Sequence, residues 1–64
     1  MNTMGYRRYW LMYSNPSNNF GWVSHSSFND YESSTEICIE MCKSHPELDW
    51  YVWDDTTGEE IFRP

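Results

Sequence analysis

The chain has 64 residues, a formal net charge of −6 at pH 7 and an aromatic content of 19%. A chain of this length is expected to form one domain over residues 1–64, and a domain so small buries only about 60% of the surface that its unfolded chain exposes. The acidic balance disfavours direct binding to nucleic acid or to membrane phosphates. No run of about 18 apolar residues, the length that a membrane-spanning helix needs, is present in the sequence.

The charges are divided unevenly along the chain. Residues 1–28 contain two arginines and no acidic residue, whereas residues 29–64 contain all ten acidic residues beside two basic ones. The second half is therefore expected to attract a basic surface. The N-terminus has no apolar signal-peptide region, and a cytoplasmic location is expected.

The first predicted element is a strand at residues 6–13, YRRYWLMY, which is followed by the turn-forming sequence SNPSNN. This strand is expected to end near Ser14. A second, weaker strand is predicted at residues 20–25, FGWVSH, where Gly21 indicates a bulge or a close backbone approach. The two strands could form a hairpin through residues 15–19.

A helix is predicted in the segment SSFNDYESSTEICIEMCKSHPE. Ser33 followed by Glu36 matches a capping box, in which each side chain satisfies a backbone N–H at the start of the helix. An earlier start at Asn29 or Asp30 is also open. Pro46 ends the helix, because a proline disfavours helical geometry in the residue before it.

The predicted helix has a mainly apolar side and an acidic side, at about 100° of rotation per residue. The apolar side contains Tyr31, Ser34, Ile37, Cys38, Met41, Cys42 and His45. Opposite these residues lie Glu32, Glu36, Glu40 and Lys43, with Ile39 near the acidic side.

Two further strands follow the helix, at residues 48–54 and 59–63, and the turn DDTTGEE joins them. Gly58 suits the left-handed position of a short hairpin loop. The element order is therefore ββαββ. The sequence predicts a small α+β fold in which a four-stranded antiparallel sheet packs against one helix.

The first and third strands carry large side chains on both faces, because side chains alternate along a strand. The rows of the third strand are Leu48, Trp50 and Val52 against Asp49, Tyr51 and Trp53. The rows of the first strand are Tyr9, Leu11 and Tyr13 against Arg8, Trp10 and Met12. Ile61 and Phe62 in the last strand are likewise expected to point in opposite directions. One helix covers one face of such a sheet, so rings remain on the other.

Two interpretations of these remaining rings are open. They form a contact surface around Tyr51, Trp53 and either Trp10 or Tyr9, because interface hot spots favour Trp, Tyr and Arg. Alternatively, they are half-exposed rings whose cross-strand pairs stabilise a small sheet by about 0.2–1 kcal/mol each. The first interpretation predicts a partner, which could be a different molecule or a second copy of the chain.

The acidic residues form two candidate docking groups. Glu32, Glu36 and Glu40 recur at every fourth position of the helix, where like charges oppose one another. The hairpin adds a second cluster, Asp49, Asp54, Asp55, Glu59 and Glu60, of which Asp54, Asp55 and Glu59 are the candidate contacts. Regularly spaced carboxylates can occupy the phosphate sites of a nucleic-acid-binding protein and so mimic DNA. The alternative role is a solvated surface that keeps an aromatic-rich protein in solution.

The two cysteines lie four residues apart, where helical geometry disfavours a disulfide, so free thiols are expected. With His45, and with His25 approaching from the second strand, Cys38 and Cys42 could hold a zinc ion. The spacing C-x3-C-x2-H is not that of a zinc knuckle, and the favoured role of these cysteines is in the core. No cofactor and no catalysis are expected.

No motif identifies a family. In length, acidity and aromatic content, and in having no catalytic set, the chain resembles the small inhibitors that bacteriophages direct at host defence or nucleic-acid machinery. The expected function is that of a non-catalytic protein-binding module, an inhibitor that docks on a larger protein with a basic surface. The alternatives are a self-associating structural subunit that uses the aromatic face and, less favoured, a small zinc module.

Overall fold

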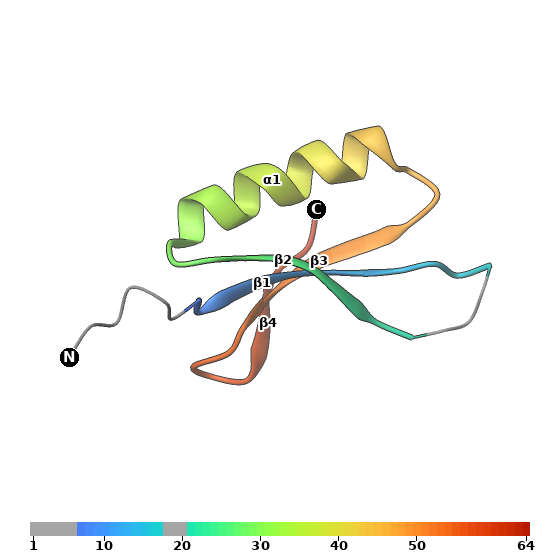
Figure 1. Cartoon of the computed structure of the whole chain (residues 1–64). Helices are drawn as coiled ribbons and strands as arrows, with labels where there is room; N and C mark the ends of the chain where they lie inside the picture. The colour runs from blue at the N-terminus through green and yellow to red at the C-terminus, as the bar shows by residue number, and fades with distance from the viewer. Residues whose placement is uncertain (1–6, 18–20) are drawn as a thin grey trace.

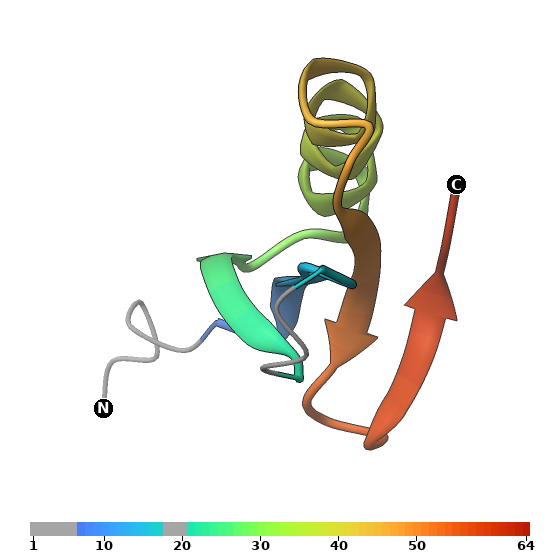
Figure 2. The same ribbon diagram turned by 90° about the vertical axis from the view of Figure 1, so that its right-hand side faces the viewer.

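The computed structural model describes residues 7–17 and 21–64 of the chain. Within these residues the elements are β1 (Tyr9–Ser14), β2 (Val23–Phe28), α1 (Tyr31–Ser44), β3 (Asp49–Asp54) and β4 (Glu59–Phe62), shown in Figure 1. The strands form one antiparallel sheet in the order β2-β1-β3-β4. Figure 2 shows α1 on one side of this sheet. The predicted α+β fold and its ββαββ order are confirmed.

The strand positions differ from the predicted ones mainly at the first hairpin. β1 begins at Tyr9 and ends at Ser14, which confirms the predicted end of the strand. Tyr6, the first residue of the predicted strand, lies outside the described residues. β2 begins at Val23, later than predicted, and residues 18–20 of the hairpin loop lie outside the description. Gly21 has a φ of +85°, a left-handed conformation that suits glycine and does not fit a strand. It therefore precedes β2 instead of forming a bulge within it.

The helix begins one turn earlier than the predicted capping box. Asp30 is the N-cap, and its carboxylate accepts a hydrogen bond of 2.9 Å from the backbone N–H of Ser33. The capping box at Ser33 is therefore wrong, and the earlier start at Asp30 is confirmed. An aspartate here also places a negative charge at the positive end of the helix dipole. At the other end, His45 is the C-cap and Pro46 follows it, as predicted.

The core lies between α1 and the face of the sheet that carries Leu11 and Val52, which pair directly across β1 and β3. Both are fully buried, as is Cys38 of the helix, and Trp50 is 3% exposed. The helix contributes small side chains at the closest approach, Ser34 and Cys38, so its backbone can lie near the sheet. Around this centre pack the half-buried residues Tyr9, Tyr13, Phe28, Met41, Cys42, Leu48, Ile61 and Phe62.

The buried stripe of α1 is narrower than the predicted apolar side. Ile37, which the helical pattern places on that side, is 37% exposed, and Ile39 on the other flank is 39% exposed. The reason is that α1 contacts the sheet along the line of Ser34 and Cys38. A residue one position before this line lies at the margin of the contact.

Within the described residues, no helix has the length and apolar character needed to cross a membrane.

A bulge in β4 alters the predicted direction of one side chain. Val52 pairs with Phe62, but the next residue of β3, Trp53, pairs with Glu60, so Ile61 is the extra residue of β4. Ile61 and Phe62 both pack against the core. The expectation that they point in opposite directions is therefore wrong, because strict alternation is lost at a bulge.

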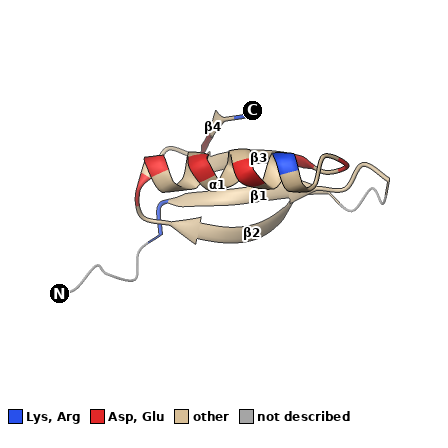
Figure 3. Cartoon of the chain, turned by 90° about the horizontal axis from the view of Figure 1, so that it is seen from above, with Lys and Arg blue, Asp and Glu red and all other residues tan. Residues whose placement is uncertain are grey.

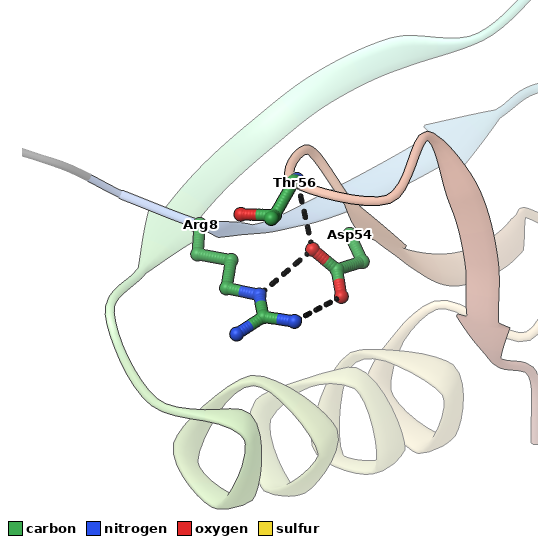
Figure 4. A network of polar contacts seen from close by, with 3 residues as sticks. All are labelled: Arg8, Asp54 and Thr56. Carbon is green, nitrogen blue, oxygen red and sulfur yellow. Dashed lines mark hydrogen bonds and ion pairs between the residues drawn. The ribbon is translucent and has the colours of Figure 1, made fainter.

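An ion pair closes the corner where β1 begins and β3 ends (Figure 4). Asp54 is 4% exposed, and its carboxylate accepts hydrogen bonds from Arg8 at Nε (2.9 Å) and at a terminal guanidinium nitrogen (3.0 Å). The backbone N–H of Thr56 donates a third hydrogen bond of 2.9 Å. The hydrogen bonds from Arg8 hold the pKa of Asp54 below its usual value, against the opposing effect of burial. Gly58, with a φ of +72°, closes the adjoining turn, as predicted.

We expect the substitution Asp54→Asn to lower the free energy of unfolding near neutral pH, and this loss to shrink as the pH falls. The folded-state pKa of Asp54 is lowered, so its carboxylate stabilises the fold fully above the unfolded value of about 3.9. That contribution is lost as the pH falls through the folded pKa. Urea unfolding followed by tryptophan fluorescence, between about pH 7 and pH 2, measures the difference.

The matched control is Asp55→Asn, which removes the same charge from an exposed neighbour. We expect a change within about 0.5 kcal/mol for the control, as for most surface substitutions. A loss of equal size in both variants, or one that does not depend on pH, would contradict a structural role for the Asp54 carboxylate.

Candidate functional site

The face of the sheet opposite α1 carries the second set of rings. Trp10 pairs with Trp53 and Met12 pairs with Tyr51, so these four side chains lie on the side away from Leu11 and Val52. We call this side the open face, because no helix or strand of the described residues lies over it (Figure 2). The expectation that one ring-bearing row stays uncovered by the helix is confirmed. The helix takes the row of Trp50, which leaves Tyr51 and Trp53 on the open face.

Tyr51 is the centre of a ring cluster on the open face. The ring of Trp22 meets it edge to face, with 4.6 Å between centroids, and the ring of Trp53 lies at 6.5 Å in the same type of arrangement. Tyr51 is only 9% exposed, whereas Trp22 is 42% exposed. The predicted contact residue Tyr51 is thus a buried support, and Trp22 joins the surface around it.

Trp22 was not among the predicted contact residues. It precedes β2, and β1 lies between β2 and the strand that carries Tyr51. The signal in the sequence is its position two residues before Ser24, which pairs with Met12 on the open face. This relation is useful only when the pairing register of β2 with β1 is known. His25 is an extra residue of β2 that shifts this register.

Arg63 and Glu60 complete the cluster. The guanidinium of Arg63 donates two hydrogen bonds to the Glu60 carboxylate, at 2.7 and 2.8 Å. Its central carbon lies 5.5 Å from the Trp22 ring centroid and 5.3 Å from that of Tyr51. Trp22, Tyr51, Glu60 and Arg63 are called the Arg63 cluster from here on. It combines two ring contacts to a cation with one bidentate carboxylate.

The charges in the Arg63 cluster affect one another. The hydrogen bonds from Arg63 lower the pKa of Glu60, and the same contact raises the pKa of Arg63. Burial, followed by the negative charge of Glu60, raises the pKa of the Tyr51 hydroxyl. At neutral pH the cluster therefore holds one cation, one anion and two neutral rings.

The acidic residues of the helix lie on the other side of the molecule. Glu32, Glu36 and Glu40 are exposed along α1, and Figure 3 shows their band from above. In residues 7–17 and 21–64 no ion pair involves these three. The sheet separates this acidic band from the open face, so one flat partner surface cannot contact both at once.

The predicted acidic residues of the hairpin between β3 and β4 differ in their exposure to solvent. Asp55 and Glu59 are exposed at the turn between β3 and β4. Asp54, predicted together with them, is buried and bound to Arg8. Its charge is neutralised within the chain, so we leave it out of the surfaces considered below.

The cysteines and histidines are placed around the core. Cys38 is fully buried and Cys42 is half-buried, and both are free thiols. Burial, with a smaller effect of Cys42, raises the pKa of Cys38 to about 11. His25 and His45 lie against the ring of Trp50, with centroid distances of 5.6 and 6.2 Å. In the described part of the chain, no three His, Cys, Asp or Glu side chains gather into a group that could hold a metal ion.

Comparison of the chain with protein-family models, with characterised proteins and with solved structures found no match. The functional proposal therefore depends on the geometry of this molecule. That geometry offers binding chemistry, in the form of one exposed and two half-buried tryptophan rings, a half-exposed guanidinium and the carboxylates of α1. These groups lie on two opposite surfaces.

We expect the two thiols to differ strongly in reactivity towards 5,5′-dithiobis(2-nitrobenzoate). The Cys38 thiol is fully buried and its raised pKa keeps it protonated at about pH 8, whereas the nucleophile is the thiolate. Under native conditions, the faster phase of thiol modification should disappear in the Cys42→Ala variant and remain in the Cys38→Ala variant. Rapid modification of both thiols, or protection of both by added Zn²⁺, would contradict the core placement of Cys38 and favour a metal site.

Proposed function

We propose that this chain is a non-catalytic protein-binding module whose docking surface is the open face. The observation that carries the proposal is that α1 covers one face of the sheet, while the opposite face carries Trp10, Trp53 and Trp22 around the buried Tyr51. Large aromatic side chains and arginine dominate the energetics of protein interfaces. Trp53 and Trp10, which pair directly across β3 and β1, are the proposed central anchors.

The proposed partner is a larger protein with a basic surface. The chain carries a net charge of −6, and the band of Glu32, Glu36 and Glu40 has no ion pair within the described residues. A field of this sign raises the rate at which a basic partner is encountered and weakens as salt is added. Because the band lies across the sheet from the open face, its proposed role is attraction at a distance.

Docking of this kind is proposed to inhibit the partner. A protein that binds nucleic acid, whether in processing or in defence, carries a basic surface, and an acidic domain seated on it would block access or compete with the nucleic acid. The resemblance in size and composition to phage inhibitors supports this role. A cytoplasmic location is part of the proposal, since Cys38 and Cys42 are both free thiols, as is typical of a reducing compartment.

Two other uses of the same surfaces make different predictions. In nucleic-acid mimicry, the acidic band of α1 would itself contact the basic groove. In self-association, a second copy of the chain would cover the open face. The net charge of −6 opposes association of two copies, because it repels like molecules. We therefore favour a different, basic molecule as the partner of the open face.

We expect Trp53→Ala to weaken binding of the captured partner by about 30-fold or more, which corresponds to the loss of about 2 kcal/mol at an interface hot spot. The partner is isolated from the native cell with the wild-type chain, identified by mass spectrometry and then purified for calorimetry. Circular dichroism verifies that the variant is folded, which we expect because Trp53 lies outside the buried core.

The matched control is the double substitution Glu36→Lys and Glu40→Lys on the opposite side of the molecule. We expect it to reduce the association rate and its salt dependence, with at most a few-fold effect on dissociation. The reverse result, with binding lost in the lysine variant and kept in Trp53→Ala, would favour nucleic-acid mimicry instead. A wild-type dimer in light scattering that Trp53→Ala dissociates would favour self-association.

A further inference from the structure

The Arg63 cluster is built in the way that proteins recognise an arginine side chain. We propose that this corner of the open face binds an arginine of the partner, and that Arg63 occupies the same place in the free protein. The inference rests on the proposed function, since it names the chemistry that a basic partner would present to the open face. It adds that Arg63 competes with the partner's arginine for this site, which the proposed function does not require.

The geometry of the cluster suits a guanidinium better than an ammonium group. The carboxylate of Glu60 accepts from Nε and from a terminal nitrogen of Arg63, at 2.7 and 2.8 Å, in the bidentate arrangement that a planar guanidinium allows. The same group lies 5.3–5.5 Å from two ring centroids, within the range of cation–π attraction. A lysine can make the charge contact, but it lacks the planar fork.

The centre of the receiving surface belongs to the sheet, whereas its present occupant lies at the end of the last strand and is half-exposed. Tyr51 lies in β3, between β1 and β4, and it is buried. Arg63 follows the last residue of β4, and its side chain is 47% exposed beside the 39% exposed side chain of Glu60. Half-exposed ion pairs contribute modestly to stability, and bidentate Arg–carboxylate pairs contribute more than most. Displacing Arg63 from the cluster therefore has a moderate cost, and it leaves Tyr51 in place within the sheet.

Displacement of Arg63 would leave a site with excess negative charge. Asp49 lies two residues before Tyr51 in β3, so alternation places it on the same face, and Glu60 lies opposite Trp53. The charges of Asp49 and Glu60 both act on the guanidinium of Arg63. Two carboxylates beside two rings, in a chain of net charge −6, are complementary to an arginine of a basic surface.

The probe for this site is the blocked tripeptide acetyl-Gly-Arg-Gly-amide, with acetyl-Gly-Lys-Gly-amide as its matched control. Binding is followed by the NMR shift of the Trp22 indole N–H. We expect Arg63→Ala to bind the arginine peptide severalfold more tightly than the wild-type chain, because in the wild type the tethered Arg63 side chain must first be displaced from the site. We expect the lysine peptide to bind severalfold more weakly than the arginine peptide.

The second pair of variants separates recognition from general charge. In the Arg63→Ala background, Glu60→Gln should abolish the gain, whereas Glu36→Gln, which removes the same charge from α1, should preserve it. Arg63→Gln serves in place of the alanine variant if circular dichroism shows that Arg63→Ala is unfolded. Equal binding of the two peptides, an equal effect of Glu36→Gln and Glu60→Gln, or no gain on removing Arg63 would each overturn the proposal.

These outcomes are distinguishable from failure of the proposed function. If Trp53→Ala abolishes partner binding but the peptide does not prefer Arg63→Ala, the open face docks a partner and the arginine site is wrong. If the peptide binds as expected but Trp53→Ala leaves partner binding unchanged, the arginine site exists and the proposed docking surface is wrong. Tighter binding of the purified partner to Arg63→Ala, with weaker binding to Trp53→Ala, is the result expected if both proposals hold.

Discussion

The packing of α1 on one face of the sheet is the constraint on which the rest of this structure depends. The helix approaches through Ser34 and Cys38, and the sheet meets it with Leu11, Val52 and Trp50. This small core stabilises the fold by apolar burial, which is limited in a chain of 64 residues. Because α1 occupies one face, the alternation of side chains in β1 and β3 delivers the remaining rings to the other.

The chain covers part of that second face with its own residues. Trp22 and Arg63 lie over Tyr51 from opposite edges of the sheet and reduce its exposure to 9%. Both interpretations of the rings therefore have a physical basis. Contacts between rings support a small sheet, and Trp22, at 42% exposure, still offers apolar area to a partner. On the open face, Tyr51 is therefore a buried ring at the centre, Trp10 and Trp53 are half-buried, and Trp22 is exposed.

The two arginine ion pairs have different consequences. Arg8, whose own side chain is 41% exposed, binds the buried carboxylate of Asp54, which needs such a partner because burial disfavours its charge. This pair joins the start of β1 to the end of β3 and removes one acid from the surface. Arg63 and Glu60 form a half-exposed pair on the ring cluster. The first pair belongs to the fold, and the second leaves charged groups accessible to another molecule.

The sequence by itself determined the properties that depend on neighbours along the chain. These are the element order, the end of the helix at Pro46, the left-handed turn at Gly58 and the presence of rings on both faces of two strands. Tertiary structure alone decided which row the helix covers, the burial of Asp54 and the meeting of Trp22 with Arg63. It also placed Ile61 in a bulge. The physical reason is that local periodicity fixes alternation, whereas long-range pairing, such as that of Arg8 with Asp54, fixes register and burial.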